Sequence, residues 1–411
     1  MDLTTEKPDA PTATPTSTSF TTLLNMIGLL IGLGQLSTAY ALQNGGWATA
    51  FLLFGLFMLG AYTSHLLGLC LATNVRLRNY SDIGFLAFGK TGRCVSLVFI
   101  NLEIFMALVS FTISMTDNLS RVLDGYNFDI SFFGLSTAQS LTVIAIVVCI
   151  PTVWLRNLDS ISFISTFSIL LTFLICGVLI CTCLFGSVKA DKGIPVFRIK
   201  NIFSVSGLYI FNIASHIAIP EVYRSMVDPA GFSIISFLSF GAVATLYTFL
   251  AFLGAKMFGP GVASQFTLSM PKHLAFTQIA LWAAVIVPMT KYVFLTVPMA
   301  SEVERHLPAK MPLRRRTVIR GAAGSLLLII VLVLAIAIPF FETVLSLTGS
   351  FVCIFVSAIL PIAFYLEIFR KKIQLPSFRT IPPACTAALR DKDFDLGLDS
   401  STWYELTELL G

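Results

Sequence analysis

Residues 28–47 read GLLIGLGQLSTAYALQNGGW, an apolar stretch that Gly32-Leu33-Gly34 interrupts at its middle. A helix that crosses a lipid bilayer must satisfy its own backbone hydrogen bonds. A weak point at mid-depth is therefore tolerated only where surrounding protein or a cavity accommodates the freed backbone groups. The stretch predicts a membrane-spanning helix that is broken at its centre.

A second apolar segment, Ile202–Arg224, is interrupted in the corresponding place by polar or helix-breaking residues: Asn212, Ser215, His216 and Pro220. Two broken helices in matching positions of two halves of a chain indicate the binding site of a secondary transporter. The sequence therefore predicts a protein that carries a small solute across a membrane.

The composition supports this class and argues against several others. Hydrophobic residues make up 56% of the 411 residues and charged residues only 12%, whereas soluble domains are about one quarter charged. The basic residues cluster in short loops, which gives no indication of a nucleic-acid partner. The eight cysteines have no metal-ligand or redox spacing. Since nucleotide-binding and nucleophile motifs are also absent from the sequence, we predict no enzyme, no catalytic residue, no cofactor and no metal.

A hydropathy window of about 19 residues predicts ten spans. They form two groups of five, residues 20–186 and residues 202–369, and predict an all-α integral membrane protein. The fourth span is short for a hydrocarbon core of about 30 Å. The spans are Phe20–Gln43, Trp47–Ala72, Arg93–Thr116, Ser140–Leu155, Ile161–Phe185, Ile202–Arg224, Gly231–Phe258, Leu274–Ala300, Val318–Phe340 and Val344–Phe369.

The distribution of basic residues predicts the orientation. Of the 27 Lys and Arg residues, 19 fall on the side of the amino terminus and Lys291 falls within a span. The seven on the opposite side are Arg121, Lys189, Lys192, Arg198, Lys200, Lys256 and Lys272. Because basic loops remain in the cytosol, we expect both termini to be cytosolic.

The two ends of the chain are poor in structural signals. Residues 1–19 are rich in Thr, Pro and Ser and predict a disordered cytosolic segment without a cleavable secretory signal. Residues 370–411 are first basic and then acidic, and they predict a cytosolic tail without a further span.

Five stretches resemble signature sequences of the amino acid/auxin permease family, with the greatest likeness to plant vacuolar amino-acid transporters. They are GLGQLSTAYALQNGGW (32–47), YSDIGFLAFGKTGR (80–93), PTVWLRNLDSISFIS (151–165), SQFTLSMP (264–271) and VPMTKYVFLTVPMA (287–300). The resemblance implies the LeuT-type fold, a five-plus-five inverted repeat with broken first and sixth helices. It also implies proton-linked movement of neutral amino acids. The family's eleventh helix is absent from the predicted spans.

In the first break the predicted substrate-binding residues are Gly32, Leu33, Gly34, Gln35 and Leu36. The start of a half-helix would present backbone N–H groups and the positive end of the helix dipole to a substrate carboxylate. The alternative is that the glycines only allow close helix packing, since Gly28 and Gly32 form a small-xxx-small pattern. The family resemblance favours the binding role.

In the second break Asn212, Ser215 and His216 place polar groups where a helix should be apolar. Polar side chains at this depth are costly and usually face a cavity. We predict that they bind the substrate, and that His216, which titrates near neutral pH, senses a proton. Hydrogen bonding between helices is the alternative.

Glu103 in the third span and Lys291 in the eighth are the deepest formal charges. A buried carboxylate is a candidate proton carrier, and an ion pair is the alternative role for Glu103. Thr290 and Lys291 are predicted to brace the site, with a structural salt bridge as the alternative for Lys291. The positive charge of Lys291 disfavours a bound metal ion in the same pocket.

Together these features predict a secondary active transporter that moves neutral L-amino acids by alternating access, driven by protons. The vacuolar membrane is the expected location and the plasma membrane the alternative. A sensor or scaffold that binds amino acids with little transport is the alternative function. A channel would need a continuous polar stripe, which the scattered polar positions do not form. The expected partners are an amino acid, protons and the lipid bilayer, and the chain is expected to be monomeric.

Overall fold

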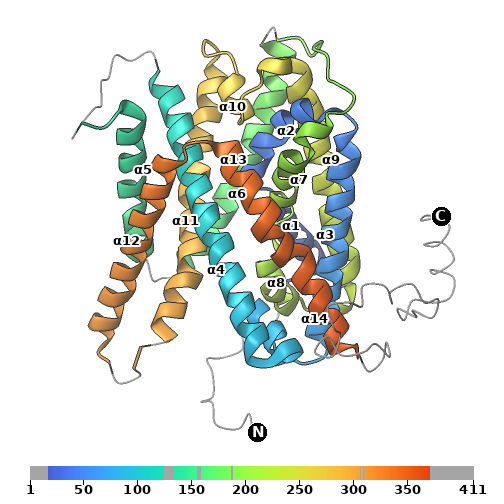
Figure 1. The fold of residues 1–411 in the computed structure, drawn as a ribbon, viewed down its shortest axis with the longest axis vertical. Coiled ribbons are helices and arrows are strands. Elements are labelled where there is room, and N and C mark those ends of the chain that lie inside the picture. The colour runs from blue at the N-terminus through green and yellow to red at the C-terminus, as the bar shows by residue number, and fades with distance from the viewer. Residues whose placement is uncertain are drawn as a thin grey trace, which may run out of the picture.

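The computed structural model describes residues 17–124, 134–154, 159–186, 188–305, 307–308 and 311–370. Within these ranges every regular element is a helix, apart from one isolated bridge that pairs Ser17 with Met226. Figure 1 shows long helices running between an upper end, which carries α10 (Phe266–Ser269), and a lower end, where α14 (Leu360–Ile368) finishes. The predicted class, an all-α integral membrane protein, is confirmed.

The first span is broken, as predicted. It consists of α1 (Ser19–Leu30), the short 3-10 helix η1 (Leu33–Ser37) and α2 (Thr38–Gly45), and its two halves meet at 51°. Gly32 joins the halves in an extended conformation, with φ −140° and ψ −159°, which cannot continue a helix.

The predicted break in the sixth span is also confirmed. The segment consists of α7 (Ile202–Phe211), a 3-10 turn η3 (His216–Ala218) and α8 (Ile219–Ser225). Between α7 and η3 the backbone follows tight turns, and the Ser215 N–H donates to the Ile213 carbonyl at 2.9 Å. Pro220 lies in the first turn of α8, where its missing N–H leaves no helical bond unmade.

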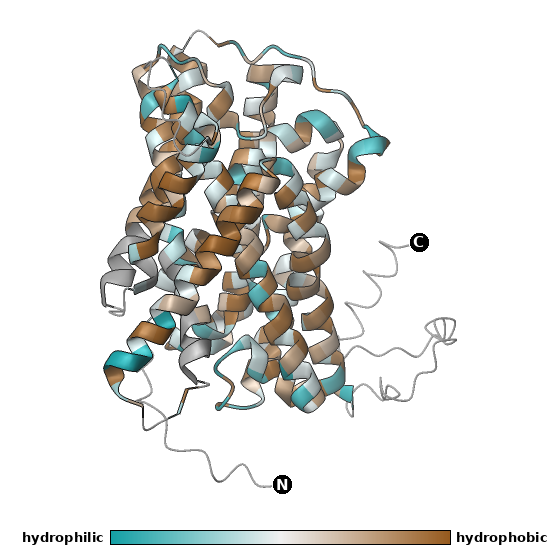
Figure 2. Ribbon diagram, turned by 60° about the vertical axis from the view of Figure 1, so that its left-hand side comes forward, coloured by the Kyte–Doolittle hydropathy of each residue, from teal (hydrophilic) through white to brown (hydrophobic). Residues whose placement is uncertain are grey.

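The other helices surround these two broken spans. Figure 2 shows hydrophobic residues along most of their length and hydrophilic residues concentrated towards the ends. The long helices are α3 (Thr49–Ala72), α4 (Tyr80–Leu123), α5 (Thr137–Trp154), α6 (Asp159–Phe185), α9 (Phe232–Phe258), α11 (Ala275–Arg305) and α12 (Leu313–Ala337). Short 3-10 turns lie at Ile199–Asn201, Pro229–Gly231 and Gly259–Gly261.

The predicted number of ten spans is not confirmed. In the described ranges seven helices are long and apolar enough to cross a membrane, and the bent first pair makes an eighth. The fourth predicted span corresponds to α5, whose apolar part is only Thr137–Pro151. These residues extend about 22 Å, which is short of the hydrocarbon thickness.

The third predicted span, Arg93–Thr116, forms only the middle of the longer helix α4. Gly89 interrupts α4 with a φ of 64° and a ψ of −145°, a conformation that favours glycine. A short helix therefore precedes the span from Tyr80 onwards. It begins with a capping box, in which the side chains of Asn79 and Asp82 pair with each other's backbone N–H groups.

The last predicted span, Val344–Phe369, contains π-helical backbone that the sequence did not indicate. After α13 (Phe341–Leu347) come two π segments, Thr348–Cys353 and Phe355–Ile359, and then α14. A π segment has no distinct hydrophobic period of its own, so only the packing of the span against its neighbours reveals it.

The helices pack in two groups around the breaks. On one side α1, α2 and α3 pack on α9, and on the other α4 and α6 pack on α11 while α5 packs on α12. α7 lies against the first π segment and α13, so the second broken span contacts the last span. The two predicted five-helix repeats stay a prediction, and nearly all of both predicted tails lies outside the described residues.

Candidate functional site

The break in the first span frees backbone groups that the flanking helices cannot pair. The Gly32 N–H donates to the hydroxyl of Tyr247 on α9 at 3.1 Å, and this hydroxyl donates to the Leu30 carbonyl at 3.2 Å. Tyr247 is fully buried. One tyrosine therefore bridges both sides of the break. The only sign of this role in the sequence is that Tyr247 is a polar aromatic residue within an apolar run.

The half-helix that follows the break, Leu33–Gly45, begins with unpaired backbone donors. In the described structure no hydrogen bond is recorded for the N–H groups of Leu33 and Gly34, whereas the Gln35 N–H donates to the Gly32 carbonyl at 3.3 Å. Such donors at a helix start are suited to an anion. A Cβ atom on Gly32 would meet nothing within 4 Å, so open space adjoins these donors.

The side chains of Gln35 and Leu36, also predicted at this site, are engaged elsewhere. The Gln35 side-chain carbonyl accepts a hydrogen bond from the thiol of Cys176 on α6, with a distance of 3.0 Å between Sγ and Oε1. Leu36 is part of the main hydrophobic core. Gly28 supports the packing alternative, because a Cβ atom there would lie 2.3 Å from Ile169. Close helix packing, the alternative role of the glycines, therefore accounts for a glycine at position 28. It does not account for Gly32, where a Cβ atom would meet open space.

The second break carries buried side-chain atoms without partners. The Asn212 amide nitrogen and oxygen and the Ser215 hydroxyl are all buried, and no hydrogen bond is recorded for them in the described structure. Each unpaired buried group costs about 1–3 kcal/mol. Three such atoms in one turn indicate a place that a ligand completes.

The structure brings the two breaks into contact at Gly34 and Asn212. A Cβ atom built on Gly34 would stand 1.7 Å from Asn212 Oδ1, so only glycine allows the amide to lie this close. The unpaired N–H groups of the first break and the unpaired amide of the second therefore share one region. This contact joins residues that the sequence placed in separate segments.

His216 belongs to the second break, but its ring faces α3. Its Nε2 atom lies 3.1 Å from the Gly60 carbonyl and 2.9 Å from the hydroxyl of Thr63. Because a carbonyl can only accept, Nε2 carries the hydrogen and donates. Nδ1 is buried without a partner in the described structure. Hydrogen bonding between helices, the alternative role of His216, therefore accounts for its Nε2 atom. Its partner Thr63 was not among the residues predicted from the sequence.

Among the described residues, no hydrogen bond or ion pair links the three remaining candidates, Glu103, Thr290 and Lys291, to either break. Glu103 on α4 is buried, and its Oε2 atom has no partner among the described residues. The Thr290 hydroxyl donates to the Val287 carbonyl of its own helix at 2.7 Å. In the described ranges no ion pair is recorded for Lys291, so the salt-bridge alternative gains no support.

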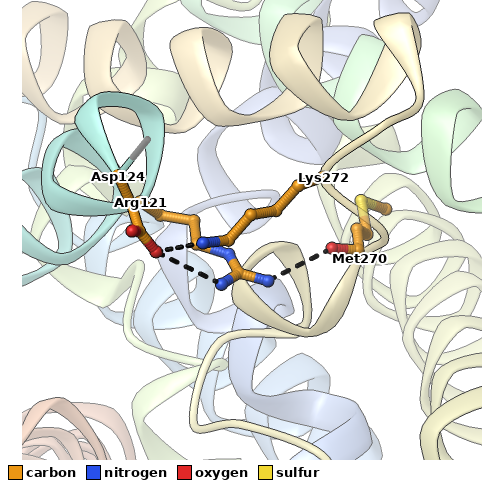
Figure 3. Close-up of polar contacts among 4 residues, drawn as sticks. All are labelled: Arg121, Asp124, Met270 and Lys272. Carbon is orange, nitrogen blue, oxygen red and sulfur yellow. Dashed lines mark hydrogen bonds and ion pairs between the residues drawn. The ribbon is translucent and has the colours of Figure 1, made fainter. Parts of the chain in front are cut away.

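At the upper end, charged groups tie α4 to the loop between α9 and α11. Figure 3 shows the Asp124 carboxylate paired with Lys272 and, at 3.8 Å, with Arg121. Arg121 also donates to the Met270 carbonyl at 3.5 Å. The hydrogen bond and charge of Lys272, helped by Arg121, hold the pKa of Asp124 below its usual value.

A buried polar network continues this connection inwards. The Gln265 amide oxygen accepts from Ser114 at 2.6 Å and from Asn118 at 2.8 Å, and its nitrogen donates to Asp117 at 3.0 Å. Thr267 donates to the Asn118 side-chain oxygen at 2.8 Å. Because α10 also contacts η1, the loop covers the upper side of the first break.

This arrangement defines a class of protein. Two discontinuous helices meet inside a multi-pass membrane bundle, and their unpaired donors and acceptors converge at the meeting point. Such a site binds a small solute within the membrane rather than on an exposed surface.

The chain belongs to the family described as transmembrane amino acid transporter protein, which matches residues 15–387. Amino acid transporter AVT1H of Arabidopsis thaliana is 49% identical over 87% of this chain and 83% of its own length. Amino acid transporter AVT1B of the same plant is 37% identical over 85% of this chain and 65% of its own length. The crystal structure of MhsT in complex with L-phenylalanine is 13% identical, with a TM-score of 0.49, over 85% of this chain and 98% of MhsT. Membership of this family makes the chain an amino acid transporter and not an enzyme.

Proposed function

We propose that this chain is a secondary active transporter that moves neutral L-amino acids by alternating access. The observation that carries the proposal is the contact between the two breaks at Gly34 and Asn212. An amino acid offers a carboxylate for the N–H groups of Leu33 and Gly34. Its ammonium group would donate to the Asn212 amide oxygen and to Ser215, whose side chains are otherwise unpaired.

The preference for neutral substrates rests on the charges near the breaks. Among the described residues the side chains at the two breaks are uncharged amide, hydroxyl and apolar groups, apart from His216, which is committed to α3. A charged substrate side chain would lose its hydration there without gaining an opposite charge, which is unfavourable. Neutral side chains avoid this penalty.

Protons are the proposed coupling ion, with Glu103 as the carrier. Its carboxyl is buried without an ionic partner in the part of the chain that the structure describes. Ionising such a group is costly until a conformational change brings it water or a counter-charge. Glu103 would therefore bind a proton in one state and release it in another. Thr290 and Lys291 of α11 are proposed to brace the site, and the charge of Lys291 disfavours a sodium ion nearby.

The lower end of the bundle is proposed to face the cytosol and the upper end the lumen of an acidic compartment, most simply the vacuole. Arg121, Lys256 and Lys272 belong to the upper end. At the other end, Arg224 of α8 donates to carbonyls in the last turn of α3 and in the α3–α4 connection. This separation agrees with the basic bias of the loops. Epitope tags before Met1 and after Gly411 should both be reached from the cytosol in intact organelles, and a protected tag at either end would contradict this orientation.

Proteoliposomes that contain the full chain test the function directly. Uptake of labelled neutral, acidic and basic amino acids is measured with and without a pH gradient, in sodium, potassium or choline. We expect neutral amino acids to accumulate only with the pH gradient and regardless of the monovalent cation. Strict sodium dependence at fixed pH would contradict proton coupling. Tight binding of an amino acid without any exchange or uptake would favour the sensor alternative instead.

A further inference from the structure

Helix α12 (Leu313–Ala337) is the least covered of the long apolar helices in the described structure. Only 28% of its most apolar 18-residue stretch is buried, whereas the share is at least 39% for the six other spans of comparable length and hydropathy. Figure 1 shows α12 at the edge of the bundle, with its first residues at the lower end. Its inner side packs on α4, α5 and α11. The rest of its surface therefore faces lipid.

Positive charges gather where α12 begins. Residues 305–320 include six basic residues and no acidic one. Arg314 and Arg315 lie in the first turn with exposed side chains, and no hydrogen bond or ion pair is recorded for these side chains in the described ranges. Arg316, in contrast, donates to the Pro308 carbonyl at 3.0 Å. Because cations at the start of a helix oppose the helix dipole, helix stability does not account for this exposed pair.

An exposed apolar stripe continues from Arg315 along the helix. Residues that follow one another at intervals of three, four and seven positions share one face of a helix, and from Arg315 this spacing leads to exposed apolar side chains. They are Ile319, Ala322, Leu326, Ile329, Ile330 and Val333. Residues 321–341 contain no charged residue and are about as many as a membrane span needs. Arg315, which precedes them, therefore lies at the level of the lipid headgroups.

Trp154, the last residue of α5, marks the same boundary beside the stripe. A Cβ atom on Gly321 would lie 2.6 Å from the Trp154 ring, and the indole N–H donates to the Ser325 hydroxyl at 3.3 Å. Trp154 is nevertheless 44% exposed. Gly321 and Ser325 follow Arg314 at helical spacing, so all three lie on one face of α12. Because tryptophan is enriched where hydrocarbon meets headgroups, the ring and Arg314 border the same part of the membrane surface.

We propose that the start of α12 is a binding site for an anionic phospholipid of the adjoining leaflet. Arg314 and Arg315 hold its phosphate, because a planar guanidinium pairs well with phosphate oxygens. One acyl chain lies along the exposed stripe, and Trp154 flanks the glycerol backbone between the two.

Two features of the site select this occupant. Both unpartnered charges are positive, so a phospholipid of net negative charge gains more than a zwitterionic one, whose own cation approaches the same arginines. The apolar stripe selects a lipid over a soluble phosphate, since only a lipid also covers the exposed side chains of α12. The inference depends neither on the proposed substrate and coupling ion nor on the proposed orientation.

Thermal unfolding of the purified full chain in detergent tests the site, with dioleoyl phosphatidylglycerol or dioleoyl phosphatidylcholine added to the micelles. We expect the unfolding temperature to rise with the mole fraction of phosphatidylglycerol and much less with that of phosphatidylcholine. Arg314→Gln combined with Arg315→Gln should weaken the apparent affinity for phosphatidylglycerol about thirtyfold, as for two lost basic contacts near a membrane surface. Arg314→Lys combined with Arg315→Lys keeps both charges and should retain most of the affinity.

Arg76→Gln combined with Arg78→Gln is the matched control. These two arginines are also exposed at the lower end, but they lie in the α3–α4 connection rather than on a membrane-spanning helix. The control removes the same charge from the same end, and its response to phosphatidylglycerol should equal that of the wild type.

Equal stabilisation of the wild type by the two lipids would overturn the inference. An unchanged affinity in the double glutamine variant, or an equal loss in the control, would do the same, and the arginines would then act only on the orientation of the chain. Glycerol 3-phosphate, which has no acyl chains, is a further arm. Stabilisation by it at the same concentration would overturn the lipid assignment in favour of a soluble phosphate.

A single substitution keeps the test decisive if the double glutamine variant is too unstable to purify. Arg315→Gln alone should weaken the affinity about fivefold, and an unchanged affinity there would equally overturn the inference. None of these measurements involves amino acid uptake, so a failure of this inference leaves the proposed function standing.

Discussion

The two breaks differ in which groups they leave unpaired. The first break is made by glycine and frees backbone groups, and Tyr247 pairs two of them across the gap. The second break is made by polar residues, and the side chains of Asn212 and Ser215 remain buried without partners in the described structure. In the described structure another side chain, that of Tyr247, spans the first break, whereas no recorded group pairs with the Asn212 and Ser215 side chains of the second.

This difference separates stability from binding. Groups that the protein already satisfies stabilise the unliganded fold, whereas unsatisfied groups destabilise it until a ligand arrives. Removing Tyr247 should therefore mainly affect stability, and removing Asn212 should mainly affect substrate affinity. Substitutions at Gly34, Asn212 and Tyr247 test this separation, and Asp124, which lies outside both breaks, gives the reference for a small effect.

Gly34→Ala is expected to have the largest effect, because Gly34 is where the breaks touch. The new Cβ atom would stand 1.7 Å from Asn212 Oδ1, so the flexible amide must swing away while the backbone is kept. Uptake at equal abundance should fall by about two orders of magnitude, as for two lost polar contacts of about 1–2 kcal/mol each. Gly55→Ala is the control, because a Cβ atom there meets nothing within 4 Å. Normal uptake by Gly34→Ala would remove this contact from the site.

Asn212→Leu should raise the KM for uptake about 10- to 100-fold, since the substrate loses a donor and an acceptor. Leucine has a shape close to that of asparagine, so the unliganded protein should unfold at the same or a higher temperature. This pair of results distinguishes an unsatisfied binding group from a structural one. A lower unfolding temperature with unchanged KM would show that the Asn212 amide stabilises the fold instead.

Tyr247→Phe should produce the opposite pattern. The Gly32 N–H and the Leu30 carbonyl lose their shared partner, which should lower the free energy of unfolding by about 1–3 kcal/mol. Thermal unfolding in detergent measures this loss, with Tyr62→Phe as a control at a partly exposed tyrosine. Substrate affinity should change less than in Asn212→Leu, and the reverse ranking would contradict the distinction between the breaks.

Asp124→Asn should have the smallest effect, because the ion pair with Lys272 is exposed and screened by salt. The pKa of Asp124 is lowered in the folded protein, so its stabilising contribution is present above the ordinary value of 3.8. The contribution is lost only as pH falls through the lowered folded pKa, which leaves the pair intact at mildly acidic pH. Unfolding temperatures measured from neutral pH down to strong acid should differ between wild type and variant only above that lowered pKa. A difference that disappears already between pH 7 and 5 would contradict this assignment.

The sequence predicted the breaks well because their causes are local. Gly32 lacks a side chain and the Asn212–Ser215 turn carries polar groups, and both features are visible in a short window of residues. The sequence was less informative about where the individual spans begin and end. The kink at Gly89, which extends α4 back to Tyr80, depends on how the helix meets its neighbours. The predicted number of ten spans is not confirmed, although most of their positions were found.

The sequence by itself determined that the chain is an all-helical membrane protein with two interrupted spans, because hydrophobic length and the loss of helix-compatible residues are properties of consecutive residues. Only the tertiary structure decided which polar groups form hydrogen bonds with one another. Tyr247 reaches Leu30 across 217 residues, and Thr63 reaches Ser357 across 294. Such pairs depend on how whole helices pack, and no local pattern encodes that packing. For this reason His216 was found as a polar residue in a break, but its partner on α3 and the π segment beyond it were not.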